Sequence, residues 1–168
     1  HAVAALVLSG AVAFAGEAKV RLATLAPKDS SVHQVLQELG QTWKAAPDGG
    51  IKLIIHADAS MGGEGDIVKK MRVGQLQAAL LTVNGLRDID ESVTALQNLP
   101  LLYRSLDEAS AVRVKLEPII RERMRAQGFE LLFLGDLGWV HFFSVKPIVR
   151  PDDLKKTKLF TWTGDVKQ

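Results

Sequence analysis

Strand and helix patterns alternate through the first half of the sequence. The runs KVRLATL at 19–25, IKLIIHA at 51–57 and QAALLTV at 77–83 are short and rich in alternating or continuous apolar residues, as expected of strands. Helices are expected between them, at 31–43 and 66–73. Strands joined through a helix in this way form a right-handed crossover. The alternation therefore predicts an α/β fold built on a parallel sheet.

Capping and turn residues set the expected ends of these elements. SVHQ at 31–34 fits a capping box, in which the serine and glutamine side chains satisfy backbone groups at a helix start. The helix that follows is expected to bury an apolar face formed by Val32, Val35, Leu36, Leu39 and Trp43. Gly74 is expected to end the second helix, and Asn84-Gly85 to close the third strand.

The second half begins with a long helical pattern. SLDE at 105–108 fits another capping box, and a helix is expected from there to Gln127, stopped by Gly128. Pro118 is expected to kink it, because the proline ring removes one hydrogen bond. Its inward positions are Ala109, Val112, Leu116, Ile120 and Met124. Further strands are expected at 129–135, 139–145 and 158–162, with a helical turn at 150–154.

The N-terminal segment is uncharged and apolar, and it ends in Ala13-Phe14-Ala15. Small residues around one larger residue are the pattern that signal peptidase accepts. A membrane span needs roughly 20 apolar residues, and this segment is shorter than that. Residues 1–15 are therefore predicted to be a secretory signal peptide cleaved before Gly16, with a buried N-terminal helix as the alternative. Because the chain starts at His1 and lacks a basic front end, the N-terminus is expected to be incomplete.

The composition excludes several classes of function. There is no cysteine, which removes disulfides, thiolate catalysis and zinc–thiolate sites. The net charge is only +2 and the sequence has no basic stripe, so it indicates no basic surface that would bind nucleic acid. The four histidines have no metal-ligand spacing, so neither a metal nor another cofactor is expected.

No catalytic arrangement stands out. The loop GGEG at 62–65 lacks the lysine of a phosphate-binding loop and the third glycine of the dinucleotide fingerprint, and Asp66 follows it. Ser30, Ser31 and His33 have the spacing of helix capping rather than of a triad. The sequence therefore favours a binding protein. A cytoplasmic nucleotide-dependent enzyme is the alternative, and it requires this loop to bind phosphate.

Four segments, taken in order, resemble one family. They are VRLATLAPKDSSVHQ, SMGGEGDIVKKMRVGQLQAALLT, NLPLLYRSLDEA and VKPIVRPDDLKKTKLF. Together they are similar to the solute receptors of tripartite ATP-independent periplasmic (TRAP) transporters, of the DctP type. The resemblance implies a periplasmic binding protein fold, type II-like, with two α/β lobes that close by hinge bending. It places the first lobe at 16–138, and the crossing strand with the start of an incomplete second lobe at 139–168.

The sequence departs from this family at the residues that bind carboxylate. Phe160, in KLFTW, and Val140 stand where the family has arginines. Neither side chain can form the paired, charge-assisted hydrogen bonds with which an arginine binds a carboxylate. A neutral or apolar ligand is therefore expected. Ligands collect outside the carboxyl ends of parallel strands. With the aromatic strands of the second lobe, this rule gives the candidate cleft residues Ala26, Asp29, Ser30, Met61, Gly62, Asn84, Val140, Phe142, Phe160 and Trp162.

The resemblance implies a non-catalytic periplasmic receptor that delivers a small organic molecule to the membrane permease of a TRAP transporter. The expected partners are that ligand and the permease subunits, with no nucleic acid. A secreted sensor or interaction module with the same fold is a further alternative. The sequence does not indicate an oligomeric state.

Overall fold

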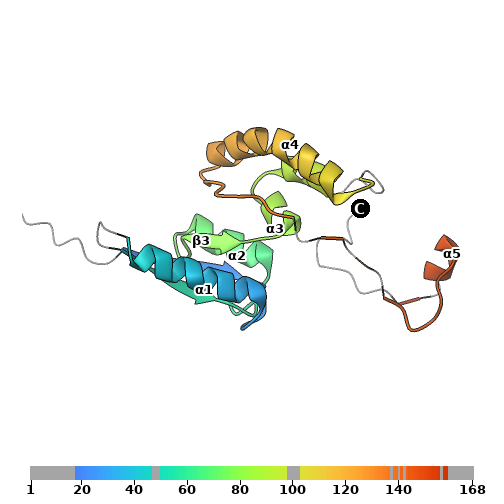
Figure 1. Cartoon of the computed structure of the whole chain (residues 1–168), viewed down its shortest axis with the longest axis horizontal. Coiled ribbons are helices and arrows are strands. Elements are labelled where there is room, and N and C mark those ends of the chain that lie inside the picture. The colour runs from blue at the N-terminus through green and yellow to red at the C-terminus, as the bar shows by residue number, and fades with distance from the viewer. Residues whose placement is uncertain are drawn as a thin grey trace, which may run out of the picture. The chain divides into compact units, whose positions relative to one another are not determined.

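A computed structural model describes residues 18–46, 50–97, 103–136, 138–139, 141, 143–155 and 157–158. The chain divides into two compact units, one within residues 1–81 and the other within 82–168. The first unit holds the strands and the second is helical (Figure 1). The predicted signal peptide lies outside the described residues and stays a prediction. Within the described part of the chain, no helix is long and apolar enough to cross a membrane.

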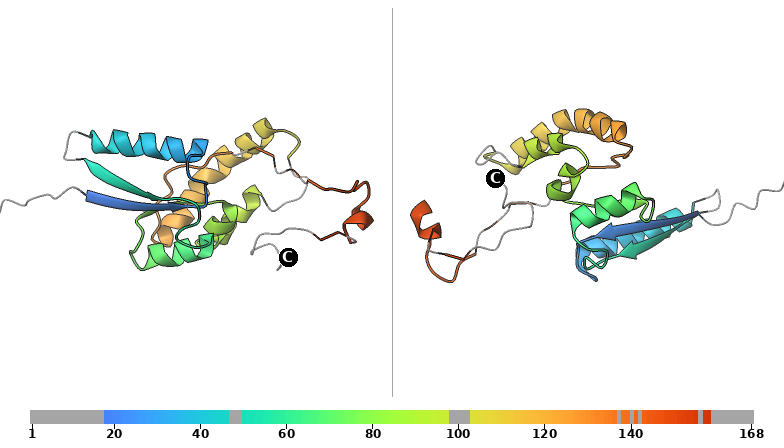
Figure 2. Two further views of the ribbon diagram at one scale, coloured as in Figure 1. Left: turned by 90° about the horizontal axis from the view of Figure 1, so that it is seen from below. Right: turned by 180° about the vertical axis from the view of Figure 1, so that it is seen from behind.

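The first unit is a three-stranded parallel sheet with strand order β2-β1-β3. The strands are β1 Ala18–Thr24, β2 Ile51–His56 and β3 Ala78–Leu80. Helices α1 Ser31–Lys44 and α2 Glu64–Arg72 lie on opposite faces of this sheet (Figure 2). The predicted α/β class with a parallel sheet is confirmed.

The register of the strands decides which side chains meet each helix. Ala23 packs with Ile67 and Leu76 in a buried cluster on the α2 side of the sheet. Strand neighbours alternate between faces, so Leu22 and its register partner Ile55 face α1. A Cβ at Gly40 would lie 3.3 Å from the Leu53 side chain, so this glycine lets α1 approach β2 closely.

The first helix begins one residue earlier than the capping box predicted, since that box made Ser31 the N-cap. Its N-cap is Ser30, whose Oγ accepts a hydrogen bond from His33 N at 3.3 Å. The buried stripe is centred on His33 and Leu36. Val35 lies about 100° around the helix from Leu36 and is 62% exposed, so its predicted burial is wrong.

The second helix and third strand also differ from the expected bounds. Helix α2 starts at Glu64, two residues before the expected start, and Gly74 follows its end with φ +73° as predicted. Strand β3 is shorter than expected, because Thr82 caps a short helix, α3 Val83–Arg87. Thr82 Oγ1 accepts from Asn84 N at 3.2 Å. The prediction that Asn84 and Gly85 form a turn after the strand is therefore wrong, since both lie in α3.

The second unit contains α3, the 3₁₀ helix η1 Glu91–Leu96 and the long helix α4 Leu106–Ala126. Ser105 caps α4 by accepting from Glu108 N at 3.1 Å, as predicted. In a capping box the Glu108 carboxylate would accept a hydrogen bond from Ser105 N. It accepts instead from Arg104 N, one residue earlier, at 2.8 Å. The predicted inward face is confirmed at Ile120 and Met124, which are buried.

The segment after α4 is not the predicted strand. Residues 129–136 have no strand pairing with other described residues, and side chains of α4 bond several of their backbone oxygens instead. Arg121 donates to Leu131 O, and Arg113 donates to Leu134 O at 3.3 Å. The described residues of 139–145 are not in a strand either, although the helical turn α5 Pro151–Leu154 is confirmed. Of KLFTW, only Lys158 lies within the described residues.

Candidate ligand-binding site

The loops after β1 and β2 are tied to each other at the carboxyl edge of the sheet. Asp58 N donates to Ala26 O at 3.1 Å, and Asp58 Oδ1 accepts from Lys28 N at 2.8 Å. Ala59 N donates to Thr24 O at 3.4 Å. These cross-links fix the backbone of 24–30 against that of 57–63. Two of the expected cleft segments, around Ala26 and around Met61, therefore belong to one connected edge.

Backbone with positive φ collects in the same two loops. Asp29, Asp58 and Ala59 have φ values of 63°, 56° and 53°, and they are the non-glycine residues with positive φ in the described part of the chain. This conformation costs about 1–2 kcal/mol at Ala59, whereas the short polar side chains of Asp29 and Asp58 tolerate it more easily. Strained backbone of this kind clusters at ligand sites, where the surrounding structure holds it in place.

Asp29 is presented to solvent by its neighbours. Its backbone N donates to His33 Nδ1 at 3.1 Å, and its backbone O accepts from Gln34 Nε2 at 3.2 Å. Its side chain is 79% exposed, and its carboxylate lies 3.9 Å from His33 Nδ1. The Asp29 carboxylate is thus available to a ligand that carries a hydrogen-bond donor.

Ser30 is engaged in holding the loop. Its hydroxyl donates to Pro27 O at 2.6 Å and accepts from His33 N at 3.3 Å. These two bonds use its donor and one of its lone pairs, so it can offer a ligand at most one further acceptor. The structure therefore gives Ser30 a role in shaping the loop beside its predicted role in binding.

Met61 and Gly62 form the tip of the second loop. Met61 packs partly against the cluster of Ala23, Ile67 and Leu76, and its carbonyl accepts from Lys70 Nζ at 2.6 Å. Gly62 has φ +94°, and a Cβ there would lie 3.0 Å from Asp66 Oδ2. Only glycine fits this position without a shift of its neighbours.

The start of α2 is acidic. Glu64 and Asp66 occupy its first turn, and Asp66 lies 3.5 Å from Lys69 Nζ. Carboxylates at a helix N-terminus occupy the positive end of the helix dipole and repel phosphate. This arrangement argues against the alternative of a nucleotide-binding enzyme. Within the described residues, no group of acidic and histidine side chains could hold a metal ion.

His56 was not among the candidate residues that the sequence indicated, since the four histidines were considered only for their lack of metal-ligand spacing. His56 is the last residue of β2, and its Nε2 is buried without a hydrogen-bond partner among the described residues. It pairs in register with Ala23, whose side chain lies on the α2 side. Its place at the carboxyl end of a parallel strand was the available signal.

The remaining candidates are placed differently. Asn84 lies in α3 within the second compact unit, half-buried, and follows β3 closely in sequence. Val140, Phe142, Phe160 and Trp162 lie outside the described residues. Their assignment to a ligand cleft stays a prediction.

The family model for bacterial extracellular solute-binding proteins of family 7, DctP, matches residues 22–166. Among curated proteins, the chain is 30% identical over 148 residues to the uncharacterized protein YiiZ of Salmonella typhimurium, covering 86% of this chain and 44% of YiiZ. The match to the family model confirms the resemblance of the four sequence segments.

Two solved structures share the fold. A TRAP periplasmic solute binding protein from Desulfovibrio salexigens, with bound orotic acid, matches with a TM-score of 0.60 at 16% identity, over 68% of this chain and 37% of that one. Another, from Sulfitobacter sp. NAS-14.1 with bound α-D-taluronate, matches with a TM-score of 0.53 at 20% identity, over 66% and 36%. The chain spans less than half the length of each of these relatives.

Proposed function

We propose that this chain, which belongs to family 7 of the bacterial extracellular solute-binding proteins, forms part of a periplasmic receptor for a small organic molecule. The receptor delivers this molecule to the permease of a TRAP-type secondary transporter. The ligand binds at the carboxyl edge of the sheet, against the loops of Ala26–Ser30 and Asp58–Gly62.

The carrying observation is that the two loops at this edge are joined by hydrogen bonds and hold backbone with positive φ. Asp29, Asp58 and Ala59 hold positive φ there, while hydrogen bonds between the loops maintain that conformation. A backbone fixed before the ligand arrives lowers the entropy lost on binding. This supports ligand binding at the edge.

The charges of these loops bear on the ligand's chemistry. Asp29 and Asp58 place two carboxylates at the edge, and Lys28 is the cation beside them. Asp58 Oδ1 already accepts from the backbone amide of Lys28, and not from its ammonium group. Together with Phe160 and Val140 in place of arginines, this favours a neutral or apolar ligand that donates hydrogen bonds. Hydroxyl and amide groups are suitable donors.

Calorimetry on the full-length protein tests this proposal, with ligands first found by a thermal-shift screen of neutral, apolar and acidic molecules. Asp29→Asn is expected to weaken binding of a donor-bearing ligand about tenfold, since a hydrogen bond to a charged group is lost. Asp107→Asn, an exposed residue of α4, is the matched control and should leave affinity unchanged. Equal affinity of the Asp29 variant and the parent would remove Asp29 from the site.

Export and delivery are tested in cells. Mass spectrometry of the periplasmic protein is expected to show an N-terminus at Gly16. Deletion of the gene is expected to abolish uptake of the ligand identified by calorimetry. Normal uptake after deletion would instead favour a secreted sensor with the same fold.

A further inference from the structure

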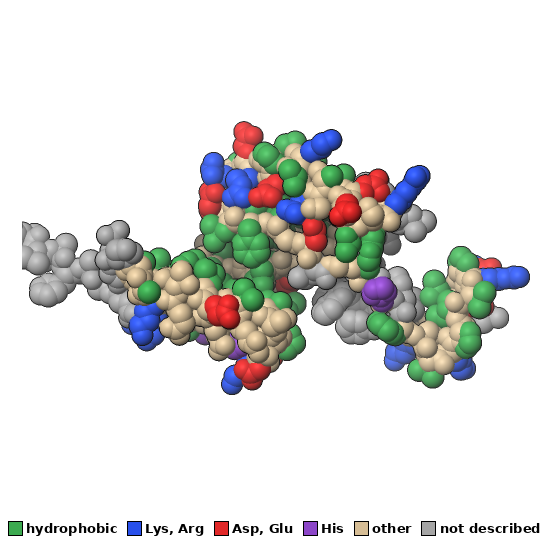
Figure 3. All heavy atoms as spheres, viewed as in Figure 1, with side chains coloured by type: hydrophobic (Ala, Val, Ile, Leu, Met, Phe, Trp, Pro, Cys, Tyr) green, Lys and Arg blue, Asp and Glu red, His purple; other side chains and the backbone are tan. Residues whose placement is uncertain are grey.

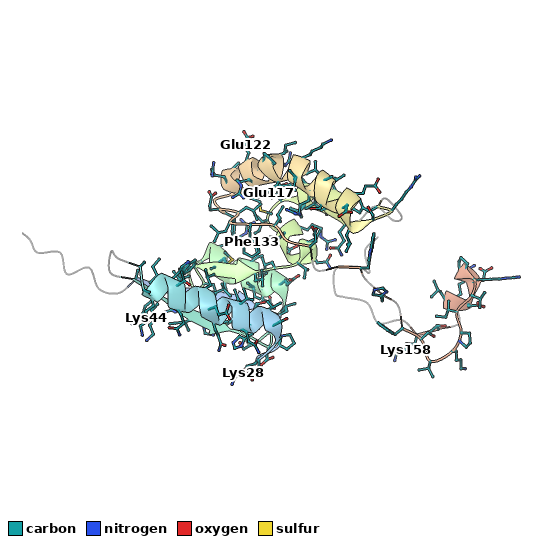
Figure 4. All side chains as sticks on the ribbon, viewed as in Figure 1. Lys28, Lys44, Glu117, Glu122, Phe133 and Lys158 are labelled. Atoms are coloured by element: carbon teal, nitrogen blue, oxygen red, sulfur yellow. The ribbon has the colours of Figure 1, made fainter. Side chains whose placement is uncertain are left out.

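Four cationic side chains gather at the amino edge of the parallel sheet, opposite the loops of the proposed cleft. Lys19 and Arg21 lie on β1, Lys52 is the second residue of β2, and Lys44 is the last residue of α1. Helix α1 runs from the carboxyl edge back to the amino edge, because it connects two parallel strands. Figure 4 accordingly shows Lys44 and Lys28 at opposite ends of α1. We call Lys19, Arg21, Lys44 and Lys52 the basic edge.

The strand register brings three of these cations onto one face of the sheet. Lys19 and Lys52 are register partners, and Arg21 lies two residues further along β1 on the same face. Ala23, the next residue of β1 on this face, is buried in the cluster beneath α2. Lys19, Arg21 and Lys52 are exposed. The amino half of this face is therefore open and basic.

No carboxylate neutralises these cations within the described residues. None of the four forms an ion pair, and the guanidinium of Arg21 donates to a neutral backbone carbonyl at 3.4 Å. Lys19 and Lys52 lie side by side in register, and like charges on neighbouring strands repel. Glu17 and Asp48, which precede the two strands in the sequence, lie outside the described residues, and the four cations outnumber them. An anionic partner at this edge would relieve the repulsion.

The carboxyl edge of the same sheet has the opposite charge. It carries Asp29 and Asp58 in its loops and Glu64 and Asp66 in the first turn of α2, with Lys28 as the nearby cation. Strand β1 spans about 20 Å between the two edges, at roughly 3.3 Å per residue. This distance exceeds the Debye length of about 10 Å at 0.1 M salt. The basic edge can therefore lie on an anionic surface without repulsion between that surface and the acidic loops.

The residue types of the basic edge favour a membrane over a protein as the partner. Three of the four residues are exposed lysines whose side chains make no hydrogen bond within the described residues. Lysine is depleted at protein–protein interfaces, where arginine and aromatic residues are enriched. An anionic bilayer requires no fixed geometry, because its negative surface potential attracts every cation that lies near it.

We propose that the basic edge docks the protein on an anionic lipid bilayer, through the headgroups of acidic phospholipids. The bond to Gln75 O holds the Arg21 guanidinium at this edge, and the three lysines bind headgroups around it. Docking in this way directs the carboxyl edge, with its acidic loops, away from the bilayer. The contact goes beyond the proposed function, because it requires neither the cleft ligand nor the permease.

Co-sedimentation of the full-length protein with lipid vesicles tests this docking. Vesicles of phosphatidylglycerol and phosphatidylcholine in equal amounts are expected to bind the protein at about 0.1 M salt, and vesicles of phosphatidylcholine alone are not. Each cation near an anionic bilayer raises the affinity about fivefold, so Lys19→Gln combined with Lys52→Gln should lower it at least about tenfold. Lys19→Arg combined with Lys52→Arg keeps both charges and should retain binding. Salt at about 0.5 M shortens the Debye length and should release the parent protein.

Lys115→Gln combined with Lys146→Gln is the matched control, because both are exposed lysines of the second unit and the change in net charge is the same. It should leave vesicle binding unchanged. The variant with glutamine at both Lys19 and Lys52 should melt no lower than the parent, since a repulsive pair is removed, which separates loss of docking from loss of folding. Equal vesicle binding by this variant and the parent would overturn the proposal, as would an equal loss in the control. Retention of the parent on poly-L-glutamate beads but not on anionic vesicles would also overturn it, and would assign the edge to an acidic protein.

Discussion

Two neighbouring glycines at the carboxyl edge, Gly62 and Gly63, differ in whether they tolerate a side chain. Gly62 has φ +94° and its Cβ would meet Asp66 Oδ2 at 3.0 Å, whereas Gly63 has φ −69° and no atom within 4 Å of its Cβ position. Gly62→Ala is expected to lower the free energy of unfolding by about 1–2 kcal/mol. Gly63→Ala should change it by less than about 0.5 kcal/mol. Urea denaturation of both variants measures the difference, and equal midpoints would show that the loop relaxes without strain.

Ala59 provides the opposite test at the same edge. Its φ of 53° strains an alanine, so Ala59→Gly is expected to stabilise the protein by up to about 1 kcal/mol, the relief being partly offset by glycine's greater freedom when unfolded. Ala57→Gly is the control, because Ala57 has no positive φ, and it should be destabilising. Thermal melts of the two variants should move in opposite directions. A lower melting temperature for Ala59→Gly would mean that the alanine side chain has a packing role.

At the scale of elements, one ion pair joins α4 to the start of η1. Arg123 Nε donates to Asp90 Oδ1 at 2.9 Å, and Asp90 also accepts from Ser92 N at the helix cap. These hydrogen bonds, first that of Arg123 and then those of Ser92, lower the pKa of Asp90 from 3.8 to about 2. Figure 3 shows exposed acidic and basic side chains mixed over the surface of α4. The Asp90 side chain, at the start of η1, is by contrast only 8% exposed.

This pKa shift has a definite consequence for stability. Asp90 binds its proton more weakly in the folded state, so its contribution is complete above pH 3.8 and is lost as the pH falls toward 2. Asp90→Asn keeps a good N-cap but removes the charge. It is expected to lower the melting temperature at neutral pH and to reduce the slope of stability against pH between those values. Glu122→Gln, on the same helix, should leave that slope unchanged.

The elements that the sequence predicted correctly are those specified by neighbours along the chain. The β1–α1–β2–α2–β3 alternation, the Ser105 cap and the stop at Gly128 follow from spacing and local turn chemistry. The segment 129–135 has an equally apolar pattern, but Arg121 and Arg113 bond its backbone oxygens. Such contacts from a preceding helix leave no trace in the segment's own pattern, so its lack of strand pairing could not be predicted.

The candidate site was predictable to a similar extent. Because ligands collect outside the carboxyl ends of parallel strands, the loops of Asp29 and Met61 could be predicted as part of the site. That reasoning gave no sign that the two loops are joined by hydrogen bonds through Asp58. His33 was recognised as a capping neighbour, while its contact with Asp29 N depends on the helix starting after Ser30. Side-chain hydrogen bonds between loops depend on backbone geometry that a linear pattern does not contain.

At the scale of the whole molecule, the second unit exposes several large apolar side chains. Leu132 and Phe133 are 65% and 60% exposed, and Phe143 and Val145 are at 94% and 104% of their reference areas. Figure 4 labels Phe133 on the segment that follows α4. Soluble monomers rarely leave so many such residues in water, because each buried Phe or Val stabilises an association by about 1.5–3 kcal/mol.

The 168-residue chain alone is therefore expected to self-associate. Phe143→Ser combined with Val145→Ser should lower the association constant at least about tenfold, since the apolar area available for contact falls. Val73→Ser is the control, because Val73 is 71% exposed but stands by itself at the end of α2, and it should have little effect. Sedimentation equilibrium measures all three proteins. A parent chain that stays monomeric at high concentration would show that residues 132–145 bury their apolar side chains in solution by a local rearrangement.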